Sequence, residues 1–156
     1  MGATLELMAR TPRTALPDGY FHVTCRSVAA AGAVFRDTGD RRTFLELLWL
    51  TSREHGWTCH AICLLTSHYH LVLEATRACL SQGMHGLNWR YAMYFNRKHG
   101  SFGHVFADRF ATRSIDGEEY LYDACAYVLL NPVRAGLSER VDEWPWSYSS
   151  FGLVAT

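Results

Sequence analysis

The sequence predicts one α+β domain of the ferredoxin-like type: an antiparallel sheet in the order β-α-β-β-α-β, with an additional helix near the C-terminus. Three observations support this prediction. Short segments rich in aromatic and β-branched residues alternate with two amphipathic segments at helical spacing. Two of the predicted strands are separated by only two residues, the spacing of a tight antiparallel hairpin. The length of 156 residues, 49% of them hydrophobic, suits one domain with its own core.

The first half of the chain supplies the first three strands and the first helix. The pattern assigns strands to residues 20–26 (YFHVTCR), 57–65 and 68–74, and a helix to residues 40–56. Gly56 is in position to end the helix in the left-handed conformation. Thr66 and Ser67 join the second and third strands, although they are not the residues that two-residue turns favour. The prediction of a hairpin therefore depends on the short distance between the two strands and not on the residues of the turn.

The second half continues the alternation. The pattern assigns a helix to residues 81–99, a strand to residues 104–114 and a third helix from Asp116 to near Asn131. Gly100 is suited to ending the second helix. Asp116 and Glu119 have the spacing of a capping box, so they predict where the third helix begins. Pro132 disfavours helical geometry at the residue before it and should limit that helix.

The two ends of the chain flank this pattern, and we expect residues 1–156 to form a single domain. Residues 1–19 contain Pro12 and Pro17 and predict an irregular lead-in. Residues 132–156 form an aromatic tail that should pack on the body of the domain, with Trp144, Trp146, Tyr148 and Phe151.

Composition limits the classes of function. The 15 Lys and Arg residues balance the 15 Asp and Glu residues, so no overall charge draws the chain to nucleic acid. The five cysteines are odd in number and form no CxxC pair, which favours reduced thiols in a cytoplasm. No apolar run approaches the roughly 20 residues of a membrane span, so we expect no membrane partner.

Positive charge is nevertheless concentrated between Trp89 and Arg113. Against a single acid, Asp108, this basic stretch holds Arg90, Arg97, Lys98, Arg109 and Arg113. These side chains would give the molecule one basic face. Ordinary solvated charge is the alternative interpretation, and the stretch alone does not separate the two.

Two histidines stand two residues apart in the second strand of the hairpin. Because side chains alternate across a strand, His68 and His70 point to one face while Tyr69 points to the other, toward the core. Two imidazoles projecting side by side from a rigid strand form half of a metal site. A pair of partly buried histidines bonded to the backbone is the alternative interpretation.

The third helix carries a tyrosine and an asparagine one turn apart. Tyr127 and Asn131 are therefore neighbours on one helical face. The alternative is a core tyrosine and an asparagine that caps the helix before Pro132. We expect the Asn131 amide to point toward the space between the two histidines, with Tyr127 facing the same cleft.

These side chains would suit a divalent metal ion. Two histidines and one amide oxygen form a nitrogen and oxygen ligand set with open positions, fit for Mg²⁺ or Mn²⁺ bound to a substrate phosphate. Mn²⁺ tolerates imidazole better than Mg²⁺ does. Zinc held through Cys59 or Cys63 is the alternative, although neither cysteine has zinc-like spacing to the histidines.

The chain resembles the REP-associated tyrosine transposases, a branch of the single-tyrosine HUH transposases. The resemblance runs from about Tyr20 to Tyr148, and the ordered set of motifs is far more specific than any one of them. Its motifs are YFHVTCR at Tyr20, FRDTGDRRTFLELL at Phe35, HGWTCHAICLLTSHYHLVLE at His55, YFNRKHGSFGHVFADRF at Tyr94, YLYDACAYVLLNPVRAGL at Tyr120 and WPWSYSS at Trp144.

The resemblance implies a DNA transposase that cuts single-stranded DNA next to imperfect, REP-like hairpins and stays joined to the 5′ phosphate. It implies His68 and His70 as metal ligands, Asn131 as the third ligand and Tyr127 as the nucleophile. The implied cofactor is Mg²⁺ or Mn²⁺. The implied setting is a bacterial cytoplasm, associated with the nucleoid when bound to DNA, as a monomer or homodimer. We expect the basic stretch, joined by Arg10 and Arg13, to contact DNA phosphates.

The departures from the family pattern concern affinity and target more than chemistry. Ser67 stands where the family usually has asparagine, a change expected to alter a contact behind the first histidine. Asp108 precedes Arg109 where a small residue is usual, and it would weaken phosphate attraction. The rival hypothesis is a hairpin-DNA-binding protein without turnover, and a zinc-dependent hydrolase is the third. The intact set of four active-site residues favours the enzyme.

Overall fold

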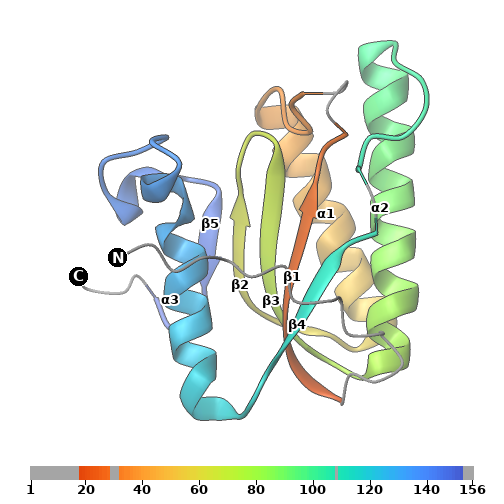
Figure 1. Ribbon diagram of the computed structural model, residues 1–156. Coiled ribbons are helices and arrows are strands. Elements are labelled where there is room, and N and C mark those ends of the chain that lie inside the picture. Colours follow the sequence, from red (N-terminus) through yellow and green to blue (C-terminus); the bar gives the residue numbers. More distant parts are fainter. Residues whose placement is uncertain (1–17, 29–31, 108, 153–156) are drawn as a thin grey trace.

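The strand that carries the two histidines, β3 (His68–Ala75), is the central strand of a five-stranded antiparallel sheet (Figure 1). The computed structural model describes residues 18–28, 32–107 and 109–152. The strand order is β4-β1-β3-β2-β5, with β1 at Gly19–Arg26, β2 at Thr58–Leu64, β4 at Ala111–Ile115 and β5 at Ser147–Ser149. The first four strands have the ferredoxin-like order, so the predicted α+β fold class is confirmed.

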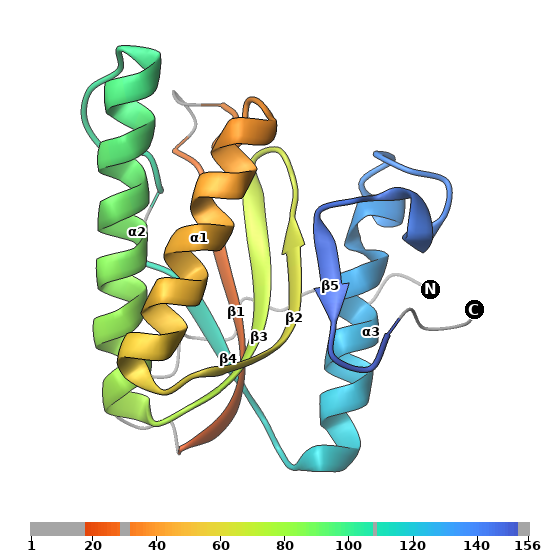
Figure 2. The ribbon, with the colours of Figure 1, turned by 180° about the vertical axis from the view of Figure 1, so that it is seen from behind.

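Two helices cover one face of the sheet and a third covers the other (Figures 1 and 2). Helices α1 (Thr38–His55) and α2 (Arg77–His99) pack on the main core, and α3 (Glu118–Arg134) packs on a smaller one. Along β3, Tyr69 and Leu71 enter the main core, whereas Val72 enters the smaller core. His68 and His70 therefore lie on the α3 face of the sheet, as the alternation predicts.

The first two helices begin earlier than the apolar pattern predicts, because each has a side-chain cap at its N-terminus. The Asp37 carboxylate accepts a hydrogen bond from the Asp40 amide, and the Thr76 hydroxyl accepts one from the Cys79 amide. These caps satisfy amides that have no partner inside the helix, so α1 begins at Thr38 and α2 at Arg77.

The predicted strand at residues 104–114 is too long. Strand β4 spans only Ala111–Ile115, and Phe106 forms an isolated bridge with Ser27. Thr24 pairs with Ala111, so the chain between Phe106 and Ala111 has more residues than the part of β1 that it faces. The extra residues prevent continuous pairing with β1, as in a β-bulge.

Helix α3 differs from its prediction at both ends. It begins after Gly117, whose φ is 95°, with no side-chain cap, so the predicted capping box at Asp116 does not form. It also continues through Pro132 to Arg134. Because Pro132 has no N–H to offer the Val128 carbonyl, Asn131 takes that role: its amide nitrogen donates to Val128 O at 3.3 Å.

The aromatic tail contributes the edge strand β5 and two hydrogen bonds to the hairpin. Leu64 N donates to Trp146 O at 2.9 Å, and Trp144 Nε1 donates to Leu64 O at 3.0 Å. The buried Arg41 guanidinium lies over the rings of both tryptophans, at 5.5 Å from Trp144 and 5.9 Å from Trp146. Tyr148 and Phe151 remain exposed, although the Phe151 ring contacts the rings of His60 and Tyr122.

No helix in the described part of the chain has the length and apolarity needed to cross a bilayer.

Two glycines of α2 should respond in opposite ways to alanine. A Cβ at Gly83 would lie 2.2 Å from Trp57 Cζ2, whereas a Cβ at Gly86 would meet nothing within 4 Å. We expect Gly83→Ala to lower the free energy of unfolding by about 1–3 kcal/mol, through overpacking. Gly86→Ala should raise it by about 0.5–1 kcal/mol, through helix propensity. Urea unfolding of both variants measures this, and equal effects would contradict the close packing of α2 on Trp57.

Candidate functional site

Three histidines gather on the α3 face of the sheet, two from β3 and one from β1. The rings of His68 and His70 are 5.1 Å apart between centroids, and His22 stacks on His70 at 5.2 Å. His22 Nε2 lies 2.9 Å from His70 Nδ1, and Thr24 Oγ1 lies 3.2 Å from the same atom. These histidines (His22, His68 and His70) form the histidine cluster.

In each β3 histidine the Nδ1 atom contacts a neighbouring side chain. His70 is buried, and its Nε2 has no hydrogen-bond partner among the described residues, while its Nδ1 contacts His22 and Thr24. His68 Nδ1 lies 3.2 Å from Ser67 Oγ. A ligating histidine usually donates its second ring nitrogen to a neighbour in this way, so the arrangement suits metal ligation through Nε2. Ser67 thus contacts the first histidine from behind.

The histidine cluster is neutral at neutral pH. Burial lowers the pKa of His22 and of His68 to about 4 each, and that of His70 to about 3. Nearby positive charge adds to the effect: Arg113 acts on His22, and Arg26 acts on His68 and His70. Neutral imidazole is the form that binds metals, so no proton has to leave before an ion binds.

Helix α3 brings Tyr127 to the histidine cluster of its own chain. The Tyr127 ring centroid lies 5.7 Å from that of His22 and 6.4 Å from that of His70. Tyr127 is 43% exposed, so a substrate can reach this residue from solution. The tyrosine predicted from helical spacing is thus placed beside the predicted pair of histidines.

Asn131 is held by its own helix. Its amide nitrogen donates to Tyr127 O at 3.1 Å and to Val128 O at 3.3 Å, and among the described residues no hydrogen bond joins it to His68 or His70. These two bonds fix which way the amide is turned, leaving the oxygen as the atom that could serve as a ligand. The structure does not join Asn131 to the histidine cluster by a direct bond.

Three arginines border the cluster. Arg113 of β4 stands opposite His22 in the sheet register, and Arg26 of β1 stands opposite His68. The Arg134 guanidinium carbon lies 4.5 Å from the centre of the Tyr127 ring. Guanidinium groups beside a site suit the binding of a phosphate.

The remaining cations of the basic stretch are distributed over other surfaces. Arg90 pairs with Glu54 at 3.2 Å, and Lys98 pairs with acids at the start of α1. Arg97 is exposed on α2, and Arg109 is exposed on the segment that leads to β4. Arg10 and Arg13 lie outside the described residues. Of the stretch that the sequence singles out, only Arg113 stands at the histidine cluster.

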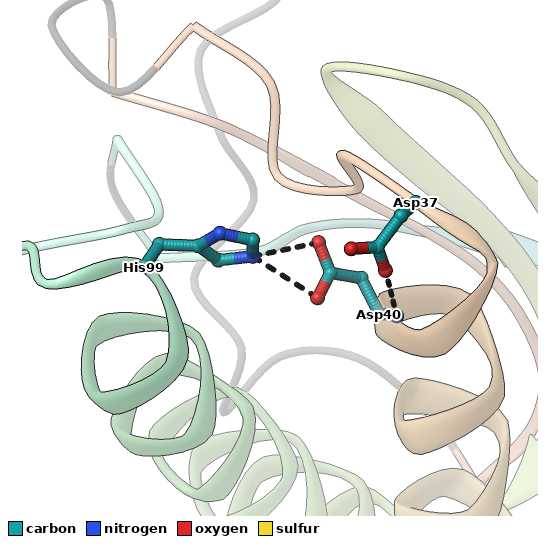
Figure 3. A group of neighbouring side chains, drawn as sticks. All are labelled: Asp37, Asp40 and His99. Atoms are coloured by element: carbon teal, nitrogen blue, oxygen red, sulfur yellow. Dashed lines mark hydrogen bonds and ion pairs between the residues drawn. The ribbon is translucent and has the colours of Figure 1, made fainter.

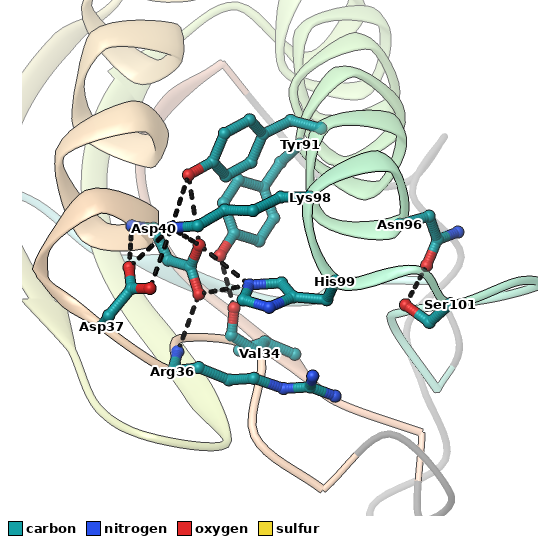
Figure 4. Close-up of polar contacts among 10 residues, drawn as sticks. Val34, Arg36, Asp37, Asp40, Tyr91, Asn96, Lys98, His99 and Ser101 are labelled. Atoms are coloured by element: carbon teal, nitrogen blue, oxygen red, sulfur yellow. Dashed lines mark hydrogen bonds and ion pairs between the residues drawn. The ribbon is translucent and has the colours of Figure 1, made fainter.

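A second set of possible metal ligands joins the start of α1 to the end of α2. Ligand atoms of Asp37, Asp40 and His99 lie within 4.8 Å of one another, and His99 Nε2 is 2.9 Å from Asp40 Oδ2 (Figure 3). The Lys98 amine sits between the carboxylates, 2.8 Å from Asp37 and 3.0 Å from Asp40 (Figure 4). Its bonds with Asp37 and Asp40 raise the pKa of Lys98, so a cation of the chain already offsets part of the negative charge of this set.

The cysteines considered as zinc ligands are poor donors. Cys63 pairs with His70 across β2 and β3, but burial raises the pKa of its thiol to about 12. Burial likewise raises the pKa of Cys59 to about 12. Zinc binds the thiolate form, which both environments disfavour.

Sequence reasoning missed three members of the site: His22, Arg26 and Arg134. A signal for the first two was present, because residues 20–26 alternate and place His22 and Arg26 on the face opposite to Phe21 and Val23. Arg134 lies two helical turns beyond Tyr127, but the expectation that Pro132 ends the helix hid this relation.

Comparison with known proteins identifies relatives. The family model described as "Transposase IS200 like" matches residues 17–130. The solved structure of a REP-associated tyrosine transposase bound to a REP hairpin is 18% identical and has a TM-score of 0.73, covering 90% of this chain and 82% of that chain. A putative transposase from Deinococcus radiodurans is 12% identical with a TM-score of 0.49, covering 86% of this chain and 97% of that chain. A comparison with curated proteins finds no match.

The metal-free protein should lose stability as the pH falls from about 6.5 toward about 4. Burial holds the pKa of His22 and His68 at about 4 in the folded protein, against 6.5 in an unfolded chain. Between these values the unfolded chain binds more protons, so the free energy of unfolding decreases as the pH is lowered. Urea unfolding at several pH values in the presence of a chelator measures the slope. His22→Gln should flatten it and His85→Gln, at an exposed position, should not; identical slopes would contradict the burial of the cluster.

Proposed function

The chain belongs to the IS200-like transposase family, and from this premise we propose that it is an active single-tyrosine transposase that cuts and rejoins single-stranded DNA through a phosphotyrosine intermediate. The observation that carries the proposal is the placement of the exposed Tyr127 beside the neutral histidine cluster within one chain. A nucleophile next to a potential metal site is the arrangement that phosphoryl transfer needs.

The ligands fit a divalent metal ion. His68 and His70 would hold it through Nε2, with the Asn131 amide oxygen as the candidate third ligand and open positions for substrate oxygens. The buried and unpartnered Nε2 of His70 supports this assignment, because a buried polar nitrogen without a partner is costly unless it binds a ligand. Mg²⁺ or Mn²⁺ would supply positive charge to a non-bridging phosphate oxygen when bound.

The chain's own cations would hold the phosphate. Arg26 and Arg113 stand opposite His68 and His22 in the sheet, so a phosphodiester drawn to them would lie against the histidine cluster. Arg134 stacks on the Tyr127 ring, where its charge favours a nucleophile that becomes negative as its proton leaves.

The chemistry would proceed by two displacements. The Tyr127 hydroxyl oxygen attacks the phosphorus, the bond from phosphorus to the 3′ oxygen breaks, and the phenol proton ends on that oxygen. The protein is then joined to the 5′ phosphate. In the second step a 3′ hydroxyl attacks the phosphotyrosine, the tyrosine oxygen leaves and takes up the proton. One phosphodiester bond is lost and one is formed, so rejoining needs no ATP.

Hairpin-bearing DNA is the proposed partner. The structural relative with a TM-score of 0.73 is bound to a REP hairpin, and the motifs YLYDACAYVLLNPVRAGL and HGWTCHAICLLTSHYHLVLE support the same substrate class here. Because Tyr127 faces the histidines of its own chain, one protomer holds the proposed nucleophile and the proposed metal ligands together.

Tyr127→Phe should abolish the covalent protein–DNA adduct and leave hairpin binding within about twofold, because only the nucleophilic oxygen is removed. The assay incubates labelled hairpin-bearing single strands with Mn²⁺ and separates adducts on denaturing SDS gels. Tyr122→Phe is the matched control, since Tyr122 is also exposed on α3 but packs against Phe151, and it should retain the adduct.

Each alternative gives a different result. An adduct that survives Tyr127→Phe would show that another residue is the nucleophile. Binding by the wild-type protein without any adduct would support the hairpin-binding protein without turnover. Cleavage without an adduct would support a hydrolase that uses water.

A further inference from the structure

Three side chains of β1 face the histidines of β3 on the α3 side of the sheet. The two strands are antiparallel neighbours (Figure 1), and their register pairs Thr24 with His70 and Arg26 with His68. His22 lies two residues before Thr24, so it faces the same side and is the diagonal neighbour of His70. A long aromatic side chain can reach across this diagonal, whereas a short hydroxyl meets the residue directly opposite. The strand pairing therefore brings two different polar groups of β1 to one imidazole.

Both groups contact the same nitrogen of His70. His22 Nε2 lies 2.9 Å from His70 Nδ1, and Thr24 Oγ1 lies 3.2 Å from that atom. His70 is only 5% exposed, and its other ring nitrogen, Nε2, is buried without a hydrogen-bond partner among the described residues. The two contacts from β1 therefore act on the nitrogen that does not bind the ion in the proposed site.

The contact between the two imidazoles requires one proton and one lone pair. If His70 binds a metal ion through Nε2, that nitrogen carries no proton, so the proton of neutral His70 lies on Nδ1. His22 Nε2 must then be the acceptor, and His22 carries its own proton on Nδ1. With His22 as the donor instead, the proton of His70 would lie on Nε2 and block the ligand position. The direction of this one hydrogen bond therefore decides whether His70 can bind a metal ion.

The acceptors for His70 carry no charge. Metal-ligating histidines usually donate to a carboxylate, a backbone carbonyl or water. Here the partners of Nδ1 are an imidazole and a hydroxyl, and among the described residues no Asp or Glu forms a hydrogen bond with His70. A carboxylate in this position would offset part of the charge of a bound ion. An uncharged acceptor leaves that charge for a substrate phosphate.

We propose that His22 is a positioning residue of the metal site: it accepts the Nδ1 proton of His70, with Thr24 as a second acceptor, and so holds His70 in the tautomer whose Nε2 is open to the ion. The inference rests on the proposed metal-dependent function and adds a residue that acts through His70 and not on the ion itself. Loss of the acceptor should therefore change the tautomer of His70 and weaken metal binding.

The first test observes the tautomer directly in the metal-free protein at neutral pH. Long-range ¹H–¹⁵N correlation spectra of ¹⁵N-labelled protein distinguish a neutral imidazole with its proton on Nδ1 from one with its proton on Nε2. The wild-type protein should show both His22 and His70 in the Nδ1 form. His22→Phe keeps an aromatic ring but has no acceptor, so His70 should populate the Nε2 form. His85→Phe, at an exposed position of α2, should leave the His70 signals unchanged.

The second test measures metal affinity from the electron paramagnetic resonance signal of free Mn²⁺ during a titration. His22→Phe should weaken Mn²⁺ binding about 10- to 100-fold, the usual effect of removing a partner behind a metal ligand. His22→Gln places an amide oxygen near the position of the histidine Nε2, so it should recover most of the affinity and keep His70 in the Nδ1 form. A role in packing alone would give the opposite order, with His22→Phe less affected than His22→Gln.

The results separate this inference from the proposed function. A His70 proton on Nε2 in the wild-type protein, or normal Mn²⁺ affinity of His22→Phe, would overturn the inference, and formation of the covalent adduct would still support the enzyme. His22→Gln binding as weakly as His22→Phe would also overturn it, because an acceptor would then have no effect. If wild-type His70 shows an Nδ1 form that His22→Phe abolishes, but the protein binds no Mn²⁺ through β3, the tautomer assignment stands and the metal-dependent function fails.

Discussion

The alternation of side chains along β3 is the constraint on which the rest of the site depends. Tyr69 is fully buried in the main core, and this anchors the register of a strand whose next residues on either side are histidines. A shift of one residue would exchange Tyr69 for an imidazole in the core and turn the histidines away from α3. Pairing of β3 with both β1 and β2 fixes that register from two sides.

Hydrogen bonds from several parts of the chain also fix the hairpin turn before His68. The carbonyl of Ser67 accepts from Ser27 N, and that of Thr66 accepts from Val34 N and Phe35 N. On the other side, Arg41 donates to Leu65 O at 3.3 Å and Trp144 donates to Leu64 O. A backbone carbonyl buried without a hydrogen-bond donor would cost about 1–3 kcal/mol. These bonds therefore stabilise the turn and fix the position of the first histidine. Through Trp144 and Trp146 the aromatic tail thus helps to hold the strand that leads into this turn.

Much of the fold follows from periodicity in the sequence, and the failures have local causes. The alternation in residues 20–26 and 68–74 and the helical spacing in α1 and α2 were sufficient for the ferredoxin-like order. The predicted fourth strand is too long because no sequence pattern marks the unpaired residues before β4. The predicted third helix is too short because Pro132 was expected to end it, whereas the Asn131 side chain donates a hydrogen bond to the Val128 carbonyl and the helix continues. At the site, spacing alone brought His68, His70 and Tyr127 together, whereas Arg134 required knowledge that α3 continues. The role of Asn131 as a ligand stays a prediction, because its amide nitrogen is bonded to its own helix.

The central claim is that the β3 histidines hold the metal ion beside Tyr127. Pulsed electron paramagnetic resonance of the protein with one equivalent of Mn²⁺ tests it most directly, because coupled imidazole nitrogens are observed and can be assigned by substitution. The account predicts two coupled nitrogens in the wild-type protein, one in either His68→Ala or His70→Ala, and no change in His99→Ala. A single coupled nitrogen that persists in both β3 variants and disappears in His99→Ala would place the ion at Asp37 and Asp40 and contradict the account.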